Sequence, residues 1–173
     1  MLASLAMRNL HAPWRMEYVA APGEQGCLFC RVLAAPPAED RANLLIHRGP
    51  DAFVLLNRFP YSSGHLMVAP RSHLASLTDL DDHATLAVTR LVRQSLGVLQ
   101  EASHPDGFNV GVNLGRVAGA GIPDHVHVHV VPRWTGDTNF MPVLGEVKVL
   151  NEHLERTWER LTALFAAGAG QSP

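Results

Sequence analysis

The chain has 173 residues, of which 47% are hydrophobic and 17% are charged, and its formal net charge is -2 at pH 7. This composition excludes a disordered chain, and the length fits one domain. Because the charge is near zero and no apolar run reaches the roughly 20 residues of a membrane helix, we expect a cytoplasmic protein that binds neither nucleic acid nor membrane.

The first part of the chain predicts an irregular arm followed by strands. Residues 1–26 mix aromatic residues with Pro and Gly, which is typical of an irregular N-terminal arm. Short apolar runs at 44–46, 52–56 and 65–69 are separated by turn residues. We therefore expect three strands in an antiparallel meander.

The second part predicts one long helix and two more strands. Apolar residues recur at intervals of three and four between 78 and 102, and Thr78 with Asp81 resembles a capping box at the start of this helix. Strands are expected at 108–113 and 125–131, the latter bounded by prolines.

A C-terminal helix is expected at 147–165, followed by a flexible tail at 166–173. The domain itself would span residues 27–165. The predicted class is α+β, with an antiparallel sheet of about five strands, one long helix and a second helix near the C-terminus.

Three histidines alternate with valines in the segment His125-Val-His-Val-His-Val-Val. On a strand, His125, His127 and His129 would share one face and look outward, while the valines would point into the core. Simple solvated histidines would show the same spacing. Two kinds of chemistry fit it as well, a metal chelate or a nucleophilic histidine with orienting partners.

Two shorter motifs also suggest chemistry: a glycine-rich loop just before the histidine segment and a pair of cysteines near the start of the domain. The loop 115–121 contributes three glycines, whose amides could point at a phosphate, although an ordinary connecting loop has the same composition. Asn113 could add an amide donor. Cys27 and Cys30 are too few for a disulfide framework, and their spacing fits a zinc site, a buried thiol pair or a redox pair.

The segment 125–131 resembles the signature of the histidine triad (HIT) superfamily at all seven positions. Residues 56–60 and 64–70 are similar to the nucleoside-binding strands of the fragile-histidine-triad branch. Residues 108–115 and 132–140 are similar to bacterial diadenosine tetraphosphate phosphorylases of that branch.

The resemblance covers roughly residues 14–160 and implies a function. A HIT enzyme of this branch would cleave a nucleoside polyphosphate, here diadenosine tetraphosphate, at the α-phosphate through a nucleotidyl-histidine intermediate, with phosphorolysis favoured over hydrolysis. A nucleotide-binding regulator with negligible turnover and a metallohydrolase that uses the histidine row are the alternatives. Family members are commonly homodimers, so we expect a homodimer here.

The resemblance also implies roles for individual residues. His127 would be the nucleophile and His129 would stabilise the transferred phosphate or the leaving group. Asn57 would bind the ribose, and phosphate oxygens would be held by Asn113 and by the amides of a further pair, Gly119 and Gly121. Many relatives carry Gln and Ser or Thr where this chain has Gly121-Ile122, so phosphate contacts from this loop would come mostly from the backbone.

Zinc-bearing relatives imply a structural metal centre. Its ligands here would be Cys27, Cys30, His73 and His125, a closed set that leaves no position for substrate. Of the other histidines, His65 is expected to be buried with its hydrogen bonds satisfied.

Overall fold

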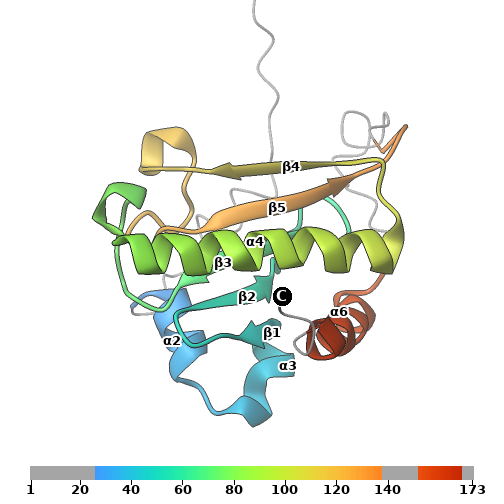
Figure 1. The fold of residues 1–173 in the computed structure, drawn as a ribbon, viewed down its shortest axis with the longest axis horizontal. Helices are drawn as coiled ribbons and strands as arrows, with labels where there is room; N and C mark the ends of the chain where they lie inside the picture. The colour runs from blue at the N-terminus through green and yellow to red at the C-terminus, as the bar shows by residue number, and fades with distance from the viewer. Residues whose placement is uncertain (1–25, 138–151, 169–173) are drawn as a thin grey trace, which may run out of the picture.

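The computed structural model describes residues 26–137 and 152–168. Its centre is a five-stranded antiparallel sheet, which confirms the α+β expectation (Figure 1). The strand order is β1-β2-β3-β5-β4. The strands are β1 (Leu45–Arg48), β2 (Ala52–Leu56), β3 (Leu66–Pro70), β4 (Gly107–Val112) and β5 (Val128–Arg133).

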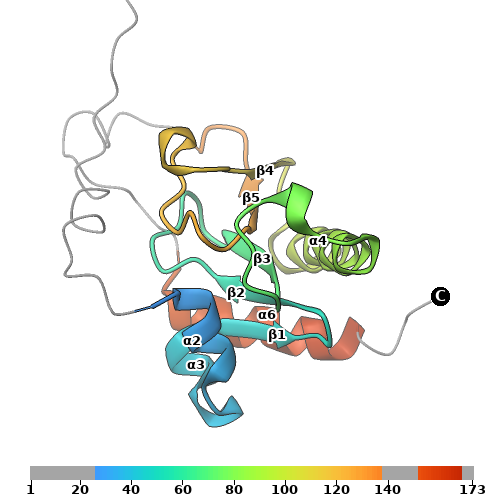
Figure 2. The same cartoon turned by 90° about the vertical axis from the view of Figure 1, so that its left-hand side faces the viewer.

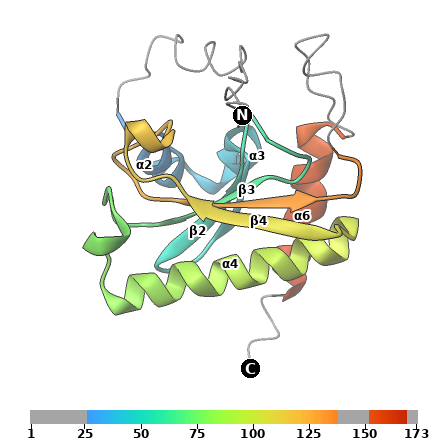
Figure 3. The same ribbon diagram turned by 90° about the horizontal axis from the view of Figure 1, so that it is seen from above.

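Helices cover both faces of the sheet. The long helix α4 (Asp82–Ser103) crosses one face and packs beside α6 (Leu154–Gly168), whereas α2 (Leu28–Ala34) lies on the opposite face (Figures 2 and 3). A third helix, α3 (Asp40–Asn43), lies against β1. Three single turns of 3-10 helix complete the described elements: η1 (Pro37–Glu39), η2 (Leu77–Asp79) and η3 (Arg116–Ala118). No helix within these described ranges combines the length and apolarity needed to cross a bilayer.

Residues of β2 and β3 alternate between two apolar clusters. Val54 and Val68 belong to the cluster under α4 and α6, whereas Phe53 and Met67 belong to the cluster under α2. Every residue of these two strands is buried, because helices cover both sides. The sheet therefore has an α4 face and an α2 face, and each side chain is assigned to one of them by its parity.

The start of α4 differs from the predicted capping box. The helix begins at Asp82, and the side chain of the preceding Asp81 accepts a hydrogen bond from the Ala84 amide at 2.7 Å. Thr78 lies in η2 instead. The prediction was wrong because Asp81 is itself a good N-cap residue, so the helix does not extend back to Thr78.

The predicted strand at 125–131 is also corrected. β5 begins at Val128, so His125 and His127 precede it, and Pro132 lies within the strand rather than after it. Val128 pairs with Val68, and continuing that register would place Val126 opposite Pro70, which has no N–H to donate. The amide of Val126 instead donates to the carbonyl of Leu74 at 2.6 Å.

The C-terminal helix exists but differs in its bounds. α6 runs from Leu154 to Gly168, three residues further than the predicted end at 165. Its predicted beginning, residues 147–151, lies outside the described residues, as do residues 1–25 of the predicted arm and residues 169–173 of the predicted tail.

Arg48 fastens α2 to the sheet. Its guanidinium group lies 2.6 Å from a carboxylate oxygen of Asp40 and donates to the backbone carbonyls of Leu33 and Ala35, each at 2.8 Å. These carbonyls belong to the end of α2, where helix carbonyls lack partners within the helix. A cation at this end also interacts favourably with the helix dipole.

Candidate functional site

The histidine segment is buried, which corrects the expectation that its side chains look outward. His125 is 0% exposed and His127 is 5% exposed, while His129 is half-buried. His129 pairs with Met67 and so lies on the α2 face. The sequence did not predict α2, because seven residues are too few to show a helical period, and this helix covers the face that would otherwise be wet.

Four side chains from three separate segments form a candidate metal centre. The ligand atoms of Cys27, Cys30, His73 and His125 all lie within 4.8 Å of one another. The cysteine sulfurs approach the two Nδ1 atoms at 3.3, 3.4 and 3.7 Å. With a Zn–S bond of about 2.3 Å and a Zn–N bond of about 2.0 Å, a tetrahedron places sulfur and nitrogen about 3.5 Å apart. The cluster therefore fits a tetrahedral zinc ion.

His125 is oriented for this centre by its second nitrogen. Its Nε2 donates to the carbonyl of Pro70 at 2.9 Å, which leaves the Nδ1 lone pair facing the thiols. Burial and, less strongly, the neighbouring Cys27 thiol raise the pKa of the Cys30 thiol. A bound cation reverses this tendency because it favours the thiolates, so metal binding would release protons.

His127 is held with one nitrogen available for chemistry. Its Nδ1 lies 2.9 Å from the carbonyl oxygen of His125, which can only accept, so Nδ1 carries the proton and Nε2 carries the lone pair. Burial lowers the pKa of His127, and the hydrogen bond to the carbonyl opposes this less strongly. At neutral pH the ring is therefore uncharged, as a nucleophilic imidazole must be.

His129 is oriented by His65, whose expected burial is confirmed at 0% exposure. The backbone N–H of Tyr61 donates to His65 Nδ1 at 3.1 Å, so the proton of a neutral His65 is on Nε2. His65 Nε2 lies 2.9 Å from His129 Nδ1 and donates to it. The remaining proton of His129 is therefore on its Nε2, which makes this nitrogen a hydrogen-bond donor.

Hydrogen bonding thus gives neighbouring histidines opposite roles. Their rings lie 4.9 Å apart, with an acceptor Nε2 on His127 and a donor Nε2 on His129. A nucleophile beside a hydrogen-bond donor fits attack at an anionic centre, because the donor stabilises the developing charge. A row of histidines chelating one catalytic metal does not fit, because His125 directs its Nδ1 at the thiols and His129 carries its proton on Nε2.

The predicted ribose and phosphate residues are placed less directly. The Asn57 side chain accepts from the Phe59 amide at 2.9 Å and lies 3.4 Å from His65 Nδ1, so it joins the histidines through the β2–β3 turn. Gly111 pairs with His129, and Val112 with Val128. Asn113 directly follows β4 and His127 directly precedes β5, so both adjoin the last pair of these strands.

The glycine loop uses part of its own hydrogen-bonding capacity. It forms η3, in which the Gly119 amide donates to Arg116 and the Ala120 amide to Gly115, at 3.0 and 3.2 Å. Gly119 has a φ of +90°, which a glycine adopts without strain. Among the described residues, none is shown to accept from the amide of Gly121. The predicted phosphate role of this loop stays a prediction.

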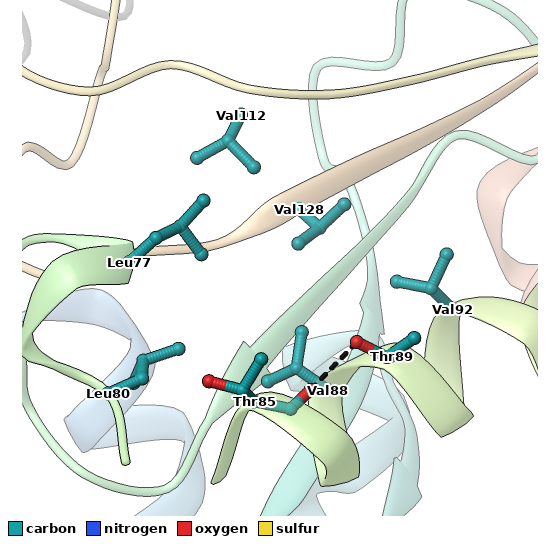
Figure 4. A pocket seen from close by; sticks show the side chains of 8 residues that line it. All are labelled: Leu77, Leu80, Thr85, Val88, Thr89, Val92, Val112 and Val128. Atoms are coloured by element: carbon teal, nitrogen blue, oxygen red, sulfur yellow. Dashed lines mark hydrogen bonds between the residues drawn. The ribbon is translucent and has the colours of Figure 1, made fainter. Parts of the chain in front are cut away.

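A pocket of about 280 Å³ lies on the α4 face, away from the histidines (Figure 4). It opens between α4 and the ends of β4 and β5, and Val88, Val112 and Val128 line it. The hydroxyl of Thr89 is used within the helix, where it donates to the Thr85 carbonyl at 2.8 Å. This lining is almost wholly apolar and offers no group suited to a phosphate.

The sequence profile of the HIT domain matches residues 39–136, and the chain belongs to the HIT family. A Mycobacterium tuberculosis protein named AP-4-A phosphorylase is 36% identical over 92% of this chain and 85% of that protein. A Zn-bound histidine triad family protein from Mycobacterium smegmatis has a TM-score of 0.67 and 25% identity, covering 86% of this chain and 99% of that one.

The likeness extends to more distant structures in fold alone. The diadenosine triphosphate hydrolase of Plasmodium falciparum has a TM-score of 0.58 at 16% identity, covering 74% of this chain and 78% of that one.

Proposed function

We propose that this chain cleaves diadenosine tetraphosphate at an α-phosphate through a covalent intermediate on His127. The observation that carries this proposal is the neutral His127 ring, whose Nδ1 proton is held by the His125 carbonyl at 2.9 Å. That bond leaves the Nε2 lone pair beside the donor Nε2 of His129. The 36% identity with AP-4-A phosphorylase supports this substrate.

In the first step, Nε2 of His127 attacks the α-phosphorus, and a nitrogen–phosphorus bond forms. The bond from phosphorus to the bridging oxygen breaks, and ATP leaves with its electron pair. His129 donates its Nε2–H to a phosphate oxygen, which stabilises the negative charge on the phosphate. The Nδ1–H bond to the His125 carbonyl strengthens as His127 becomes positively charged.

In the second step, an oxygen of inorganic phosphate attacks the same phosphorus. The nitrogen–phosphorus bond breaks, its electron pair returns to His127 Nε2, and ADP leaves. Over both steps, diadenosine tetraphosphate and phosphate give ADP and ATP, and one proton is released to solvent. Water as the acceptor would give AMP instead of ADP.

Substrate contacts complete the proposal. Asn57 would bind the ribose, and phosphate oxygens would be held by Asn113 and the amides near Gly119 and Gly121. Two observations support these roles: Asn57 lies beside His65, and Asn113 and His127 both adjoin the last pair of β4 and β5. Because the amide of Gly119 already donates within the loop, the amide of Gly121 is the stronger candidate of the two.

We also propose that the cluster of Cys27, Cys30, His73 and His125 binds a structural zinc ion. Its sulfur–nitrogen distances support a tetrahedral set, and a related family protein from M. smegmatis is described as Zn-bound. With four protein ligands, zinc would crosslink the start of α2 to the segment before β5 and would present no open position to a substrate. The catalytic groups would then be the protein's own.

A homodimer and a cytoplasmic location remain part of this proposal. β4 is one of the two outer strands of the described sheet, and its Val110 is 47% exposed. On α4, Leu86 is 48% exposed. An open strand edge beside exposed apolar side chains favours pairing with another chain. Sedimentation equilibrium should give twice the mass of the chain, and Val110→Lys should shift the protein toward monomer.

The test of the enzymatic proposal is a product assay with ¹⁸O-labelled phosphate. We expect ADP plus ATP, with the label in the β-phosphate of ADP and a rate that rises with phosphate. AMP plus ATP at a rate independent of phosphate would instead identify a hydrolase with the same first step. Two ADP formed without phosphate would contradict attack at the α-phosphorus, and binding without turnover would favour a nucleotide-binding regulator.

A further inference from the structure

Phe29 lies between the two cysteines and contacts both functional clusters, yet neither cluster uses it chemically. Its side chain is 0% exposed. The centroid of its ring lies 5.1 Å from that of His125 and 4.8 Å from that of His127. Of these two ring contacts of Phe29, the one with His127 is the closer.

The position of His127 needs a second restraint. Its Nδ1–H bond to the His125 carbonyl fixes one corner of the ring, but an imidazole attached by one hydrogen bond can still tilt about that corner. The ring of His129 meets it at an interplanar angle of 74°, and that of Phe29 at 42°. The two rings therefore meet His127 at different inclinations, and Phe29 belongs to the buried apolar cluster under α2.

We propose that Phe29 is a positioning residue, which holds the His127 imidazole at the angle its Nε2 needs for attack on phosphorus. The proposal rests on the nucleophilic role proposed above. Phe29 is carried by the first turn of α2, directly between Cys27 and Cys30, so the turn that contributes two metal ligands also supports the nucleophile. Misplacing a reacting group by about 1 Å can cost up to 100-fold in rate.

The variant Phe29→Leu tests this role, and Phe53→Leu is its matched control. Phe53 is also 0% exposed and touches the rings of Phe29 and His125, at centroid distances of 6.1 and 6.4 Å. No ring contact between Phe53 and His127 occurs within the described residues. The two variants thus remove the same atoms from the same apolar cluster, and only Phe29→Leu removes a ring from His127.

Three measurements are made on wild type and both variants, after thermal unfolding has shown that each is folded. They are kcat and KM with diadenosine tetraphosphate and phosphate, the zinc content, and the imidazole proton resonances of His127 by NMR, assigned with His127→Ala. For Phe29→Leu we expect kcat to fall about tenfold with KM within about twofold, because a tilted nucleophile slows attack without removing substrate contacts.

The same variant should keep its zinc and show a displaced His127 resonance, because the ring current of Phe29 is gone. Phe53→Leu should keep kcat within about twofold of wild type and leave the His127 resonance in place. An unchanged kcat in Phe29→Leu, or an equal loss in Phe53→Leu, would overturn the positioning role. If wild type itself gave no turnover, the proposed function would fail, whereas an unmoved His127 resonance in Phe29→Leu would overturn the positioning role alone.

Discussion

The two ends of the histidine segment contain the same side chain in different chemical settings. His125 is fully buried, with Nε2 bound to the Pro70 carbonyl and Nδ1 facing two thiols. His129 is half-buried, with Nδ1 bound to the imidazole of His65. A histidine's role is therefore set by the partner of one ring nitrogen, because that partner decides whether the other nitrogen accepts or donates.

His127 lies between these two ends, and its removal should have the largest effect. We expect His127→Ala to lower kcat at least ~10⁴-fold, or more than about 5 kcal/mol of barrier, because the variant lacks the nitrogen that is proposed to form the covalent bond. Nucleotide affinity, measured by calorimetry, should change only a few-fold. Activity near that of wild type would show that the covalent bond forms elsewhere.

Cys30→Ser tests the setting of His125 by removing one of the two thiols that its Nδ1 faces. We expect zinc to be lost and the free energy of unfolding to fall by about 4 kcal/mol when zinc is supplied at roughly a thousand times its Kd. Metal analysis and chemical denaturation give both quantities. His129→Ala is the control and should keep its zinc; if His129→Ala lost the metal while Cys30→Ser kept it, the histidine row would be the metal site.

His65→Phe tests the setting of His129 by removing its hydrogen-bond donor. Without the donor, His129 Nδ1 loses its partner at 2.9 Å and its ring can adopt the other tautomer. We expect kcat to fall about tenfold, equivalent to ~1.4 kcal/mol of barrier, with zinc content unchanged. His65→Gln can still donate to His129, so it should recover most of the rate; equal losses in both variants would show that the bond does not matter for turnover.

His47 provides a third setting for a histidine, because the ring it contacts is the apolar side chain of Phe165. It stacks on Phe165 of α6 with centroids 5.5 Å apart, and burial lowers its pKa from 6.5. At pH values between the lowered pKa of the folded state and 6.5, the unfolded chain binds more protons at His47 than the folded chain does. The contribution of His47 to the free energy of unfolding is therefore complete above pH 6.5 and is lost as the pH falls through the pKa of the folded state.

We expect the smallest of the effects at this residue. The free energy of unfolding should fall between pH 7 and pH 5 less steeply in His47→Phe than in wild type, since the other buried histidines are common to both. Urea unfolding across this pH range measures the difference. Parallel curves for the two proteins would show that His47 does not contribute to the pH dependence.

Sequence periodicity predicted the elements that carry long patterns. The strands β2 and β3, the body of α4 and the existence of β4 and β5 all follow from apolar spacing. The four proposed metal ligands followed from the two-residue gap between the cysteines together with the family resemblance, and the structure brings them together. The division into an arm, a domain and a tail stays a prediction.

The features that the sequence did not predict depend on contacts between distant segments. Parity places His129 on one face of the sheet, but only the packing of α2 decides whether that face is wet. The hydrogen bond between His65 and His129 also joins distant segments, so sequence periodicity does not predict it. One signal was available, because His65 has the same parity as Met67, which pairs with His129 in the sheet.

The short helix α2 is fixed at both of its ends. Seven residues are far fewer than the roughly 12–15 that an isolated helix needs to persist in water, so α2 owes its order to its surroundings. Arg48 binds the carbonyls at its C-terminal end, and the thiols beside its first turn face His73 and His125. If the proposed zinc ion is bound, local opening of α2 requires both restraints to release together, so we expect its amide protons to exchange more slowly with zinc than after zinc is removed.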